Sequence, residues 1–222
     1  MSKKACIFDF DGTLVNTITD VAICFNKSLE KYGYNPHPVE LYNNFIGGNL
    51  QTVVTNLLVH NQEKKYTEED FDKIRKYYLD LYLRDKKINT KPYEGIVEVL
   101  KILQSDGIFL TINTNKKQIL TEELTNKFFG DIKFERIIGY SENYPSKPDP
   151  TAIYDIMKSL NLKKEDMVYV GDGASDVKTA ENAGIDSIFV TWGQGKEEDK
   201  LNKSVRYVIN KPREIVNCVL GD

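Results

Sequence analysis

The chain has few cysteines, no long apolar run and no marked excess of charge of either sign. Its three cysteines, Cys6, Cys24 and Cys218, are widely spaced and form no zinc pattern such as Cys-x-x-Cys, so buried free thiols are expected. No stretch approaches the roughly 20 apolar residues that a membrane span needs. The net charge of −3 gives no reason to expect a nucleic acid or an anionic membrane as partner.

No targeting signal is expected at the beginning of the chain. Residues 1–4 run directly into an apolar segment that is too short for the core of a signal peptide. Free thiols are typical of a reducing compartment. Together these features favour a cytoplasmic location.

What is present is an ordinary globular composition, 41% hydrophobic and 28% charged, without repeats or low-complexity segments. The length of 222 residues suggests one large domain, or one domain with an insertion. From about Asn16 to Lys91, apolar residues recur at helical spacing and no convincing strand is found. From Pro92 onward, apolar strands alternate with helices.

This alternation predicts an α/β fold, a doubly wound parallel sheet of Rossmann-like type. The strands are expected at residues 5–8, 109–113, 136–140, 167–171, 187–191 and 206–209. The helical stretch falls between the first and second of these strands and is therefore an insertion. We expect a core of residues 1–15 and 91–222 and an all-helical domain of residues 16–90.

Polar residues gather where the predicted strands end. They are Asp9, Asp11, Thr114, Asn115, Lys147, Asp172 and Asp176. Parallel strands bring their carboxyl ends to one edge of the sheet, which is where open α/β sheets bind ligands. Residues far apart in the chain are therefore expected to share one site.

The residue types in this group indicate its chemistry. Carboxylates that lie close together raise one another's pKa unless a cation offsets them. Mg²⁺ takes hard oxygen ligands from a few carboxylates, and a phosphoryl group needs cationic and N–H donors. Each motif by itself could be an ordinary turn or a helix N-cap. Together they predict a site for Mg²⁺ and a phosphoryl group.

The motifs resemble the four motifs of the haloacid dehalogenase superfamily, in order and spacing. They are residues 9–14 (Asp-Phe-Asp-Gly-Thr-Leu), Thr114 with Asn115, residues 147–150 (Lys-Pro-Asp-Pro) and residues 171–176 (Gly-Asp-x-x-x-Asp). The resemblance spans nearly the whole chain and implies that residues 16–90 are that superfamily's cap domain. Three segments make the chain most similar, within that superfamily, to phosphoglycolate phosphatases: residues 11–14 (Asp-Gly-Thr-Leu), 45–48 (Phe-Ile-Gly-Gly) and 147–150 (Lys-Pro-x-Pro). Gly173 stands where threonine is common in those enzymes.

The resemblance implies a Mg²⁺-dependent phosphatase that hydrolyses a small phosphate monoester through an aspartyl-phosphate. Asp9 would be the nucleophile, and Asp11 would be the general acid and base. The metal would be held by Asp9, the backbone carbonyl of Asp11, Asp172 and, through water or as an outer partner, Asp176. The phosphoryl oxygens would be held by Gly12, Thr114, Asn115 and Lys147.

The cap would select the substrate, a small phosphorylated metabolite. Gly47 and Gly48 are expected to face it, because a loop that closes over a substrate needs close approach of the backbone. A plain loop between two cap helices remains an alternative for these glycines. The protein is expected to be a monomer or a homodimer.

Other activities remain open. A sugar-phosphate mutase would need Arg or Lys near the cap loop, and residues 46–51 contain neither. A pyrophosphatase would fit the same motifs, whereas a dehalogenase would not need Asp11 and Asp172. The non-enzyme alternatives are a binding module without activity and a receiver-like signalling module, which would be shorter and lack the insertion.

Overall fold

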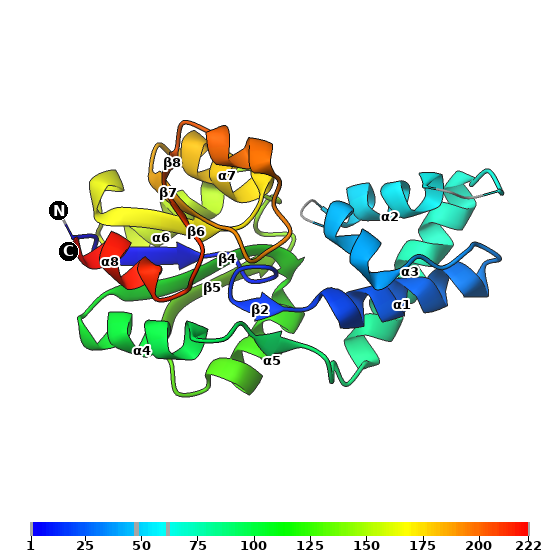
Figure 1. Ribbon diagram of the computed structural model, residues 1–222, viewed down its shortest axis with the longest axis horizontal. Helices are drawn as coiled ribbons and strands as arrows, with labels where there is room; N and C mark the ends of the chain where they lie inside the picture. Colours follow the sequence, from blue (N-terminus) through cyan, green and yellow to red (C-terminus); the bar gives the residue numbers. More distant parts are fainter. Residues whose placement is uncertain (1, 47–48, 61–62, 222) are drawn as a thin grey trace. The chain divides into compact units, whose positions relative to one another are not determined.

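The computed structural model describes residues 2–46, 49–60 and 63–221, which form two compact units (Figure 1). The first unit comprises Met1–Asn16 and Pro92–Asp222, and the second comprises Thr17–Lys91. Gly47 and Gly48, which the sequence analysis places at the substrate, lie outside the described residues.

The first unit contains a six-stranded sheet with the order β5-β4-β1-β6-β7-β8. Its strands are β1 (Ala5–Phe8), β4 (Phe109–Lys117), β5 (Phe134–Tyr140), β6 (Met167–Gly171), β7 (Asp186–Val190) and β8 (Val205–Ile209). All five pairings between neighbouring strands are parallel. The predicted doubly wound α/β core is confirmed.

Helices cover both faces of this sheet because its central strand is apolar on both sides. They are α4 (Ile96–Ser105), α5 (Gln118–Phe129), α6 (Thr151–Ser159), α7 (Ala174–Ala183) and α8 (Glu214–Leu220), with short 3-10 turns at Lys164–Asp166 and Glu197–Leu201. Cys6 and Phe8 of β1 pack in the cluster that contains α4 and α8, whereas Ala5 and Ile7 pack in the cluster that contains α6 and α7. All four side chains are fully buried.

The three thiols are free, as predicted, with Cys6 and Cys24 buried and Cys218 half-buried. Burial raises the pKa of the Cys24 thiol to about 11 and that of Cys6 further still. Both shifts disfavour the thiolate, which is the reactive form of cysteine.

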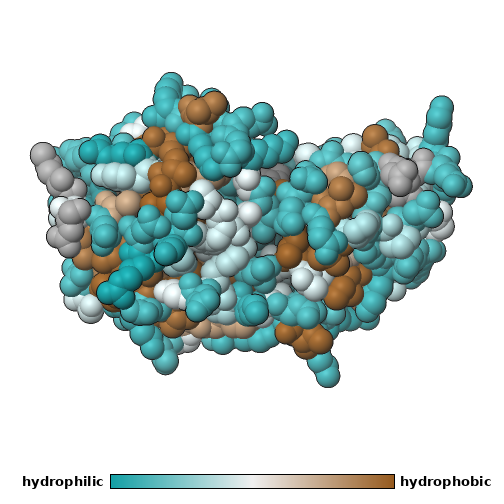
Figure 2. All heavy atoms as spheres, viewed as in Figure 1, coloured by the Kyte–Doolittle hydropathy of each residue, from teal (hydrophilic) through white to brown (hydrophobic). Residues whose placement is uncertain are grey.

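Among the described residues, no helix combines the length and the apolar character needed to cross a membrane. In the face drawn in Figure 2, hydrophilic residues predominate and hydrophobic ones lie in small separate groups.

The second unit is helical. It contains α1 (Ile18–Lys31), a 3-10 turn (Val39–Asn44), α2 (Leu50–Val59) and α3 (Glu68–Arg84). Thr67 and Asp70 form the capping box that begins α3. Phe25 of α1 and Tyr78 of α3 stack with ring centroids 3.6 Å apart. The chain enters and leaves this unit through β2 (Val15–Asn16) and β3 (Lys91–Pro92), which form a two-stranded sheet.

Asp20 joins the beginning of the second unit to its end. This carboxylate of α1 is only 3% exposed. It accepts hydrogen bonds from the Asn89 backbone N–H at 3.0 Å, from Asn89 Nδ2 at 2.8 Å and from Thr90 Oγ1 at 2.6 Å. Since Asn89 and Thr90 directly precede β3, one buried side chain ties the first helix to the returning chain.

We expect Asp20→Ala to lower the free energy of unfolding by about 2–4 kcal/mol, because three donors lose a charged acceptor. Urea denaturation measures this change. Asp72→Ala on α3 is the matched control, since the Asp72 side chain is 69% exposed and its ion pair with Arg75 contributes little. A loss for Asp20→Ala no larger than that of the control would show that the three bonds do not stabilise the unit.

Candidate active site

The carboxyl ends of β1, β4 and β6 lie together, because β1 pairs with both of the other strands. Asp9 directly follows β1, and Asp172 directly follows β6. Thr114 and Asn115 lie inside β4, which continues past the predicted end at residue 113 to Lys117, with a register irregularity in this segment. The extended strand still leaves both residues at the edge of the sheet where the other motifs end.

Three carboxylates form a buried cluster at this edge. Asp9, Asp172 and Asp176 each offer one oxygen, and these oxygens lie within 4.8 Å of one another. Asp176 stands in the first turn of α7, and its Oδ2 accepts the backbone N–H of Gly173 at 3.0 Å. The sequence analysis grouped these three residues, and the structure brings their carboxylates together.

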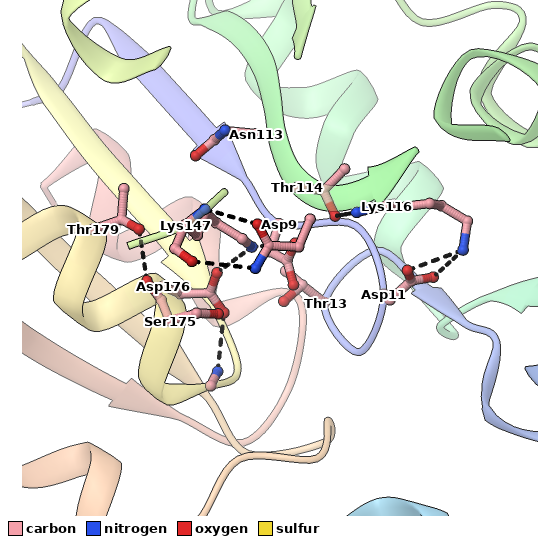
Figure 3. A network of polar contacts seen from close by, with 12 residues as sticks. Asp9, Asp11, Thr13, Asn113, Thr114, Lys116, Lys147, Ser175, Asp176 and Thr179 are labelled. Atoms are coloured by element: carbon pink, nitrogen blue, oxygen red, sulfur yellow. Dashed lines mark hydrogen bonds and ion pairs between the residues drawn. The ribbon is translucent and has the colours of Figure 1, made fainter. Parts of the chain in front are cut away.

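Lys147 lies between two of these carboxylates (Figure 3). Its Nζ is 2.7 Å from Asp9 Oδ1 and 2.6 Å from Asp176 Oδ1, and the residue is 7% exposed. Burial acts to lower the pKa of this ammonium, but the Asp176 and Asp9 charges outweigh burial and raise the pKa well above its ordinary value. Asn115 Oδ1 accepts the Lys147 backbone N–H at 2.7 Å and so fastens the loop. These contacts hold Lys147 in place and favour its charged form.

One lysine does not balance three carboxylates. Burial, followed by the charge of Asp176, raises the pKa of Asp9 to about 7 in spite of Lys147. Burial and the charges of Asp176 and Asp9 raise the pKa of Asp172 well above its ordinary value. A divalent cation would relieve this excess of negative charge. The cluster offers only carboxylate oxygens as metal ligands, which suits a hard cation such as Mg²⁺.

A loop that the sequence analysis did not assign holds Asp172 in place. The backbone N–H of Gln194 donates to Asp172 Oδ2 at 2.7 Å, and Thr13 Oγ1 donates to Oδ1 at 3.1 Å. Gly12 and Gly193 pack so closely that a Cβ atom on either would overlap the Asp172 carboxylate. The sequence signal was available, because Gly-Gln-Gly at residues 193–195 follows shortly after β7.

The carboxylate of Asp11 lies apart from the cluster and pairs with Lys116. Lys116 Nζ is 3.0 Å from each of the two Asp11 oxygens. Figure 3 draws this pair on the opposite side of Asp9 from Asp176. The Lys116 side chain is 5% exposed and that of Asp11 is 23% exposed. The sequence analysis missed Lys116, although it directly follows the Thr114-Asn115 motif.

Two of the predicted phosphate donors make bonds inside the protein. The Gly12 backbone N–H donates to the Val15 carbonyl at 3.0 Å, which occupies the group expected to hold a phosphoryl oxygen. Thr114 Oγ1 accepts the Lys116 backbone N–H at 3.3 Å, a contact that does not use its hydroxyl hydrogen. The Thr114 hydroxyl can therefore still donate a hydrogen bond to a phosphoryl oxygen, whereas the Gly12 N–H is already bonded to Val15.

A known family matches the part of the chain that contains all four motifs. The model of the haloacid dehalogenase-like hydrolases matches residues 6–190, and the chain belongs to this family. The family that the sequence motifs indicated is thus confirmed.

The chain is also similar to individual proteins and to solved structures. The chain is 29% identical over 204 residues to a phosphoglycolate phosphatase from Psychrobacter arcticus, which covers 90% of this chain and 88% of the relative. It is 30% identical over 192 residues to a phosphoglycolate phosphatase from Neisseria meningitidis serogroup A, with 86% and 82% covered. A crystal structure from Lactobacillus delbrueckii subsp. bulgaricus matches all of both chains with a TM-score of 0.89 at 24% identity, a likeness that shows the fold.

Proposed function

We propose that the protein is a Mg²⁺-dependent phosphatase that hydrolyses a small phosphate monoester, in the manner of the phosphoglycolate phosphatases to which it is similar. The observation that carries the proposal is the buried cluster of Asp9, Asp172 and Asp176, bridged by Lys147. A buried excess of carboxylates lowers stability unless a cation offsets its charge. A bound divalent metal ion would supply that charge.

The reaction has two steps in this proposal. An oxygen of Asp9 attacks the phosphorus, the bond from phosphorus to the ester oxygen breaks, and Asp11 donates a proton to the leaving alkoxide. Asp11 then takes a proton from a water molecule, whose oxygen attacks the phosphorus of the aspartyl-phosphate. Inorganic phosphate leaves and the Asp9 carboxylate is restored.

The remaining residues of the site would hold the metal ion and the phosphoryl oxygens. Asp9, Asp172 and the Asp11 backbone carbonyl would hold Mg²⁺, with Asp176 as a further or outer ligand. When bound, the ion offsets negative charge on the phosphoryl oxygens. The Lys147 ammonium and the Thr114 hydroxyl would donate to those oxygens, while Asn115 keeps Lys147 in place.

The helical unit Thr17–Lys91 is the proposed cap, and it selects the substrate. Loops and hinges of this kind exclude water from a reaction when they close. Gly47 and Gly48 remain predicted substrate contacts of this unit. The protein is proposed to act in the cytoplasm as a monomer or a homodimer.

A phosphate-release assay tests the proposed function. Wild-type protein is incubated with p-nitrophenyl phosphate and a panel of small phosphorylated metabolites, with and without Mg²⁺. We expect phosphate release that requires Mg²⁺ and is greatest for small monoesters. Isomerisation of a sugar phosphate without release would favour a mutase, and no turnover of any compound would favour a binding or signalling module.

A further inference from the structure

Asp172 lies in a closed ring of hydrogen bonds that joins the first sequence motif to the loop after β7. Thr13 Oγ1 donates to its Oδ1 at 3.1 Å, and the Gln194 backbone N–H donates to its Oδ2 at 2.7 Å. Trp192 closes the ring, because its indole Nε1 donates to the Thr13 backbone carbonyl at 3.1 Å. The two residues that bind Asp172 are therefore also fastened to each other.

The ring fixes the orientation of the Asp172 carboxylate. The terminal torsion of an aspartate is broad, so a carboxylate held through one oxygen could still turn. Donors on both oxygens remove this freedom. Asp172 is only 3% exposed, so water cannot easily replace either donor. Each oxygen has room for more than one partner and can still bind a metal ion.

The indole of Trp192 is itself held against the same turn. Its ring packs on Tyr93, with ring centroids 6.3 Å apart and the planes inclined by 56°. The Tyr93 backbone N–H donates to the carbonyl of Leu14, the residue after Thr13, at 3.1 Å. The tyrosine is thus anchored beside the carbonyl that Trp192 binds, which keeps the indole N–H directed toward it.

The loop that carries Gln194 is pressed against Asp172. A Cβ atom on Gly193 would overlap the Asp172 carboxylate, and one on Gly195 would overlap the Asp172 backbone carbonyl. Glycine has no side chain with which to attach the loop to its surroundings. The Trp192 indole supplies such an attachment, since it binds the turn at Thr13. Loss of this bond would let the loop and its Gln194 N–H move away from the carboxylate.

We propose that Trp192 is a positioning residue of the candidate metal site. Its indole N–H fastens the loop of residues 192–195 to the Thr13 carbonyl, and Thr13 and Gln194 together hold Asp172 oriented for a divalent cation. The inference rests on the proposed Mg²⁺-dependent function and adds a residue to its site. Residues that orient a metal ligand without touching the metal typically contribute about 10- to 100-fold to metal affinity.

Trp192→Phe tests the bond and not the packing, because it keeps an aromatic ring and removes the N–H. Calorimetric titration of the metal-free protein with MgCl₂ measures the Kd for Mg²⁺, which we expect to rise by about tenfold. The Mg²⁺ concentration for half-maximal phosphate release should rise by a similar factor. At saturating Mg²⁺, kcat should stay within about threefold of wild type, because the bound ion then holds Asp172 itself.

Thr191→Val is the matched control. It removes the neighbouring bond from Thr191 Oγ1 to Asn210 Oδ1 at 2.8 Å, which does not lead to Asp172, and should leave the Kd for Mg²⁺ unaltered. An equal rise of the Kd in this control would show a general effect of the loop and would overturn the inference.

The Kd for Mg²⁺ separates positioning from a purely structural role. If Trp192→Phe lowered the Tm in EDTA but left the Kd unchanged, the indole would only fill space and the inference would be wrong. Should Trp192→Phe not fold, replacement of the single tryptophan of the chain by benzothienylalanine, which has sulfur in place of the N–H, makes the same comparison. Wild-type protein that binds no Mg²⁺ would instead overturn the proposed metal-dependent function.

Discussion

Asp9→Asn is expected to lower kcat for phosphate release by about 10⁴-fold or more, the loss typical of removing a nucleophile. An amide does not attack phosphorus and does not form an aspartyl-phosphate. The substitution keeps the size of the side chain, and Lys147 keeps its bond to Asp176 at 2.6 Å, so the fold should persist. Phosphate release with Mg²⁺ present measures the loss, and circular dichroism checks the fold.

A matched control and a clear contrary result make this test decisive. Asp131→Asn makes the same chemical change at an exposed position of the same unit and should leave kcat unaltered. If Asp9→Asn kept more than about 1% of the wild-type turnover, Asp9 would be a metal ligand without a nucleophilic role, and the two-step mechanism would be wrong.

Removal of metal is expected to make the protein less stable as the pH rises through the range from 3.8, the ordinary pKa of aspartate, to about 7, the pKa of Asp9 in the fold. Within this range the folded protein keeps a proton on Asp9 that the unfolded chain has lost. Raising the pH therefore favours the unfolded state. Asp172, whose pKa is also raised, contributes with the same sign.

Thermal unfolding in EDTA measures this effect. We expect the Tm to fall by roughly 5 °C or more between about pH 5 and about pH 8. Mg²⁺ should restore the Tm, and more strongly at the higher pH, because it binds the ionised carboxylates. Lys147 does not cancel the trend, since its pKa is raised and it stays charged throughout.

Asp172→Asn supplies the contrast for this measurement. It removes one buried carboxylate, so the metal-free variant should have a higher Tm than wild type near pH 8 and a much smaller response to Mg²⁺. Activity should be lost at the same time, because the proposed metal ligand is gone. A Tm of metal-free wild type that stays constant or rises with pH would contradict the raised pKa values of Asp9 and Asp172. An unchanged Mg²⁺ response in Asp172→Asn would contradict a metal role for Asp172.

Much of the fold could be predicted because it depends on patterns that are local in the chain. The apolar runs of β1 and β6 indicated buried parallel strands, and both have the predicted bounds, Ala5–Phe8 and Met167–Gly171. The beginning of α3 likewise depends on a local pattern, the capping box of Thr67 with Asp70. The end of β4 was placed too early, because polar residues at 114–117 look like a loop, although the strand continues through an irregular register until Lys117 pairs with Tyr140 of β5.

The residues that make up the candidate site could also be predicted from local patterns. The strand pattern alone was enough to group Asp9, Thr114 and Asp172, because each follows a predicted strand and parallel strands carry their ends to one edge. The residue types also supplied the carboxylates, lysine and hydroxyl from which a metal and phosphoryl site was predicted. These conclusions need only the strand pattern and the residue types.

Which charges pair depends on how the whole chain folds. Lys147 bonds Asp9 across 138 positions of sequence, and Lys116 bonds Asp11 across 105. The backbone N–H of Gln194 donates to Asp172 across 22 positions of sequence. Such pairs depend on the reach of long side chains and on the course of loops between elements, and no local pattern encodes them. The electrostatics of the edge, in which one lysine faces the carboxylate cluster and another faces Asp11, therefore emerged only when the chain was folded.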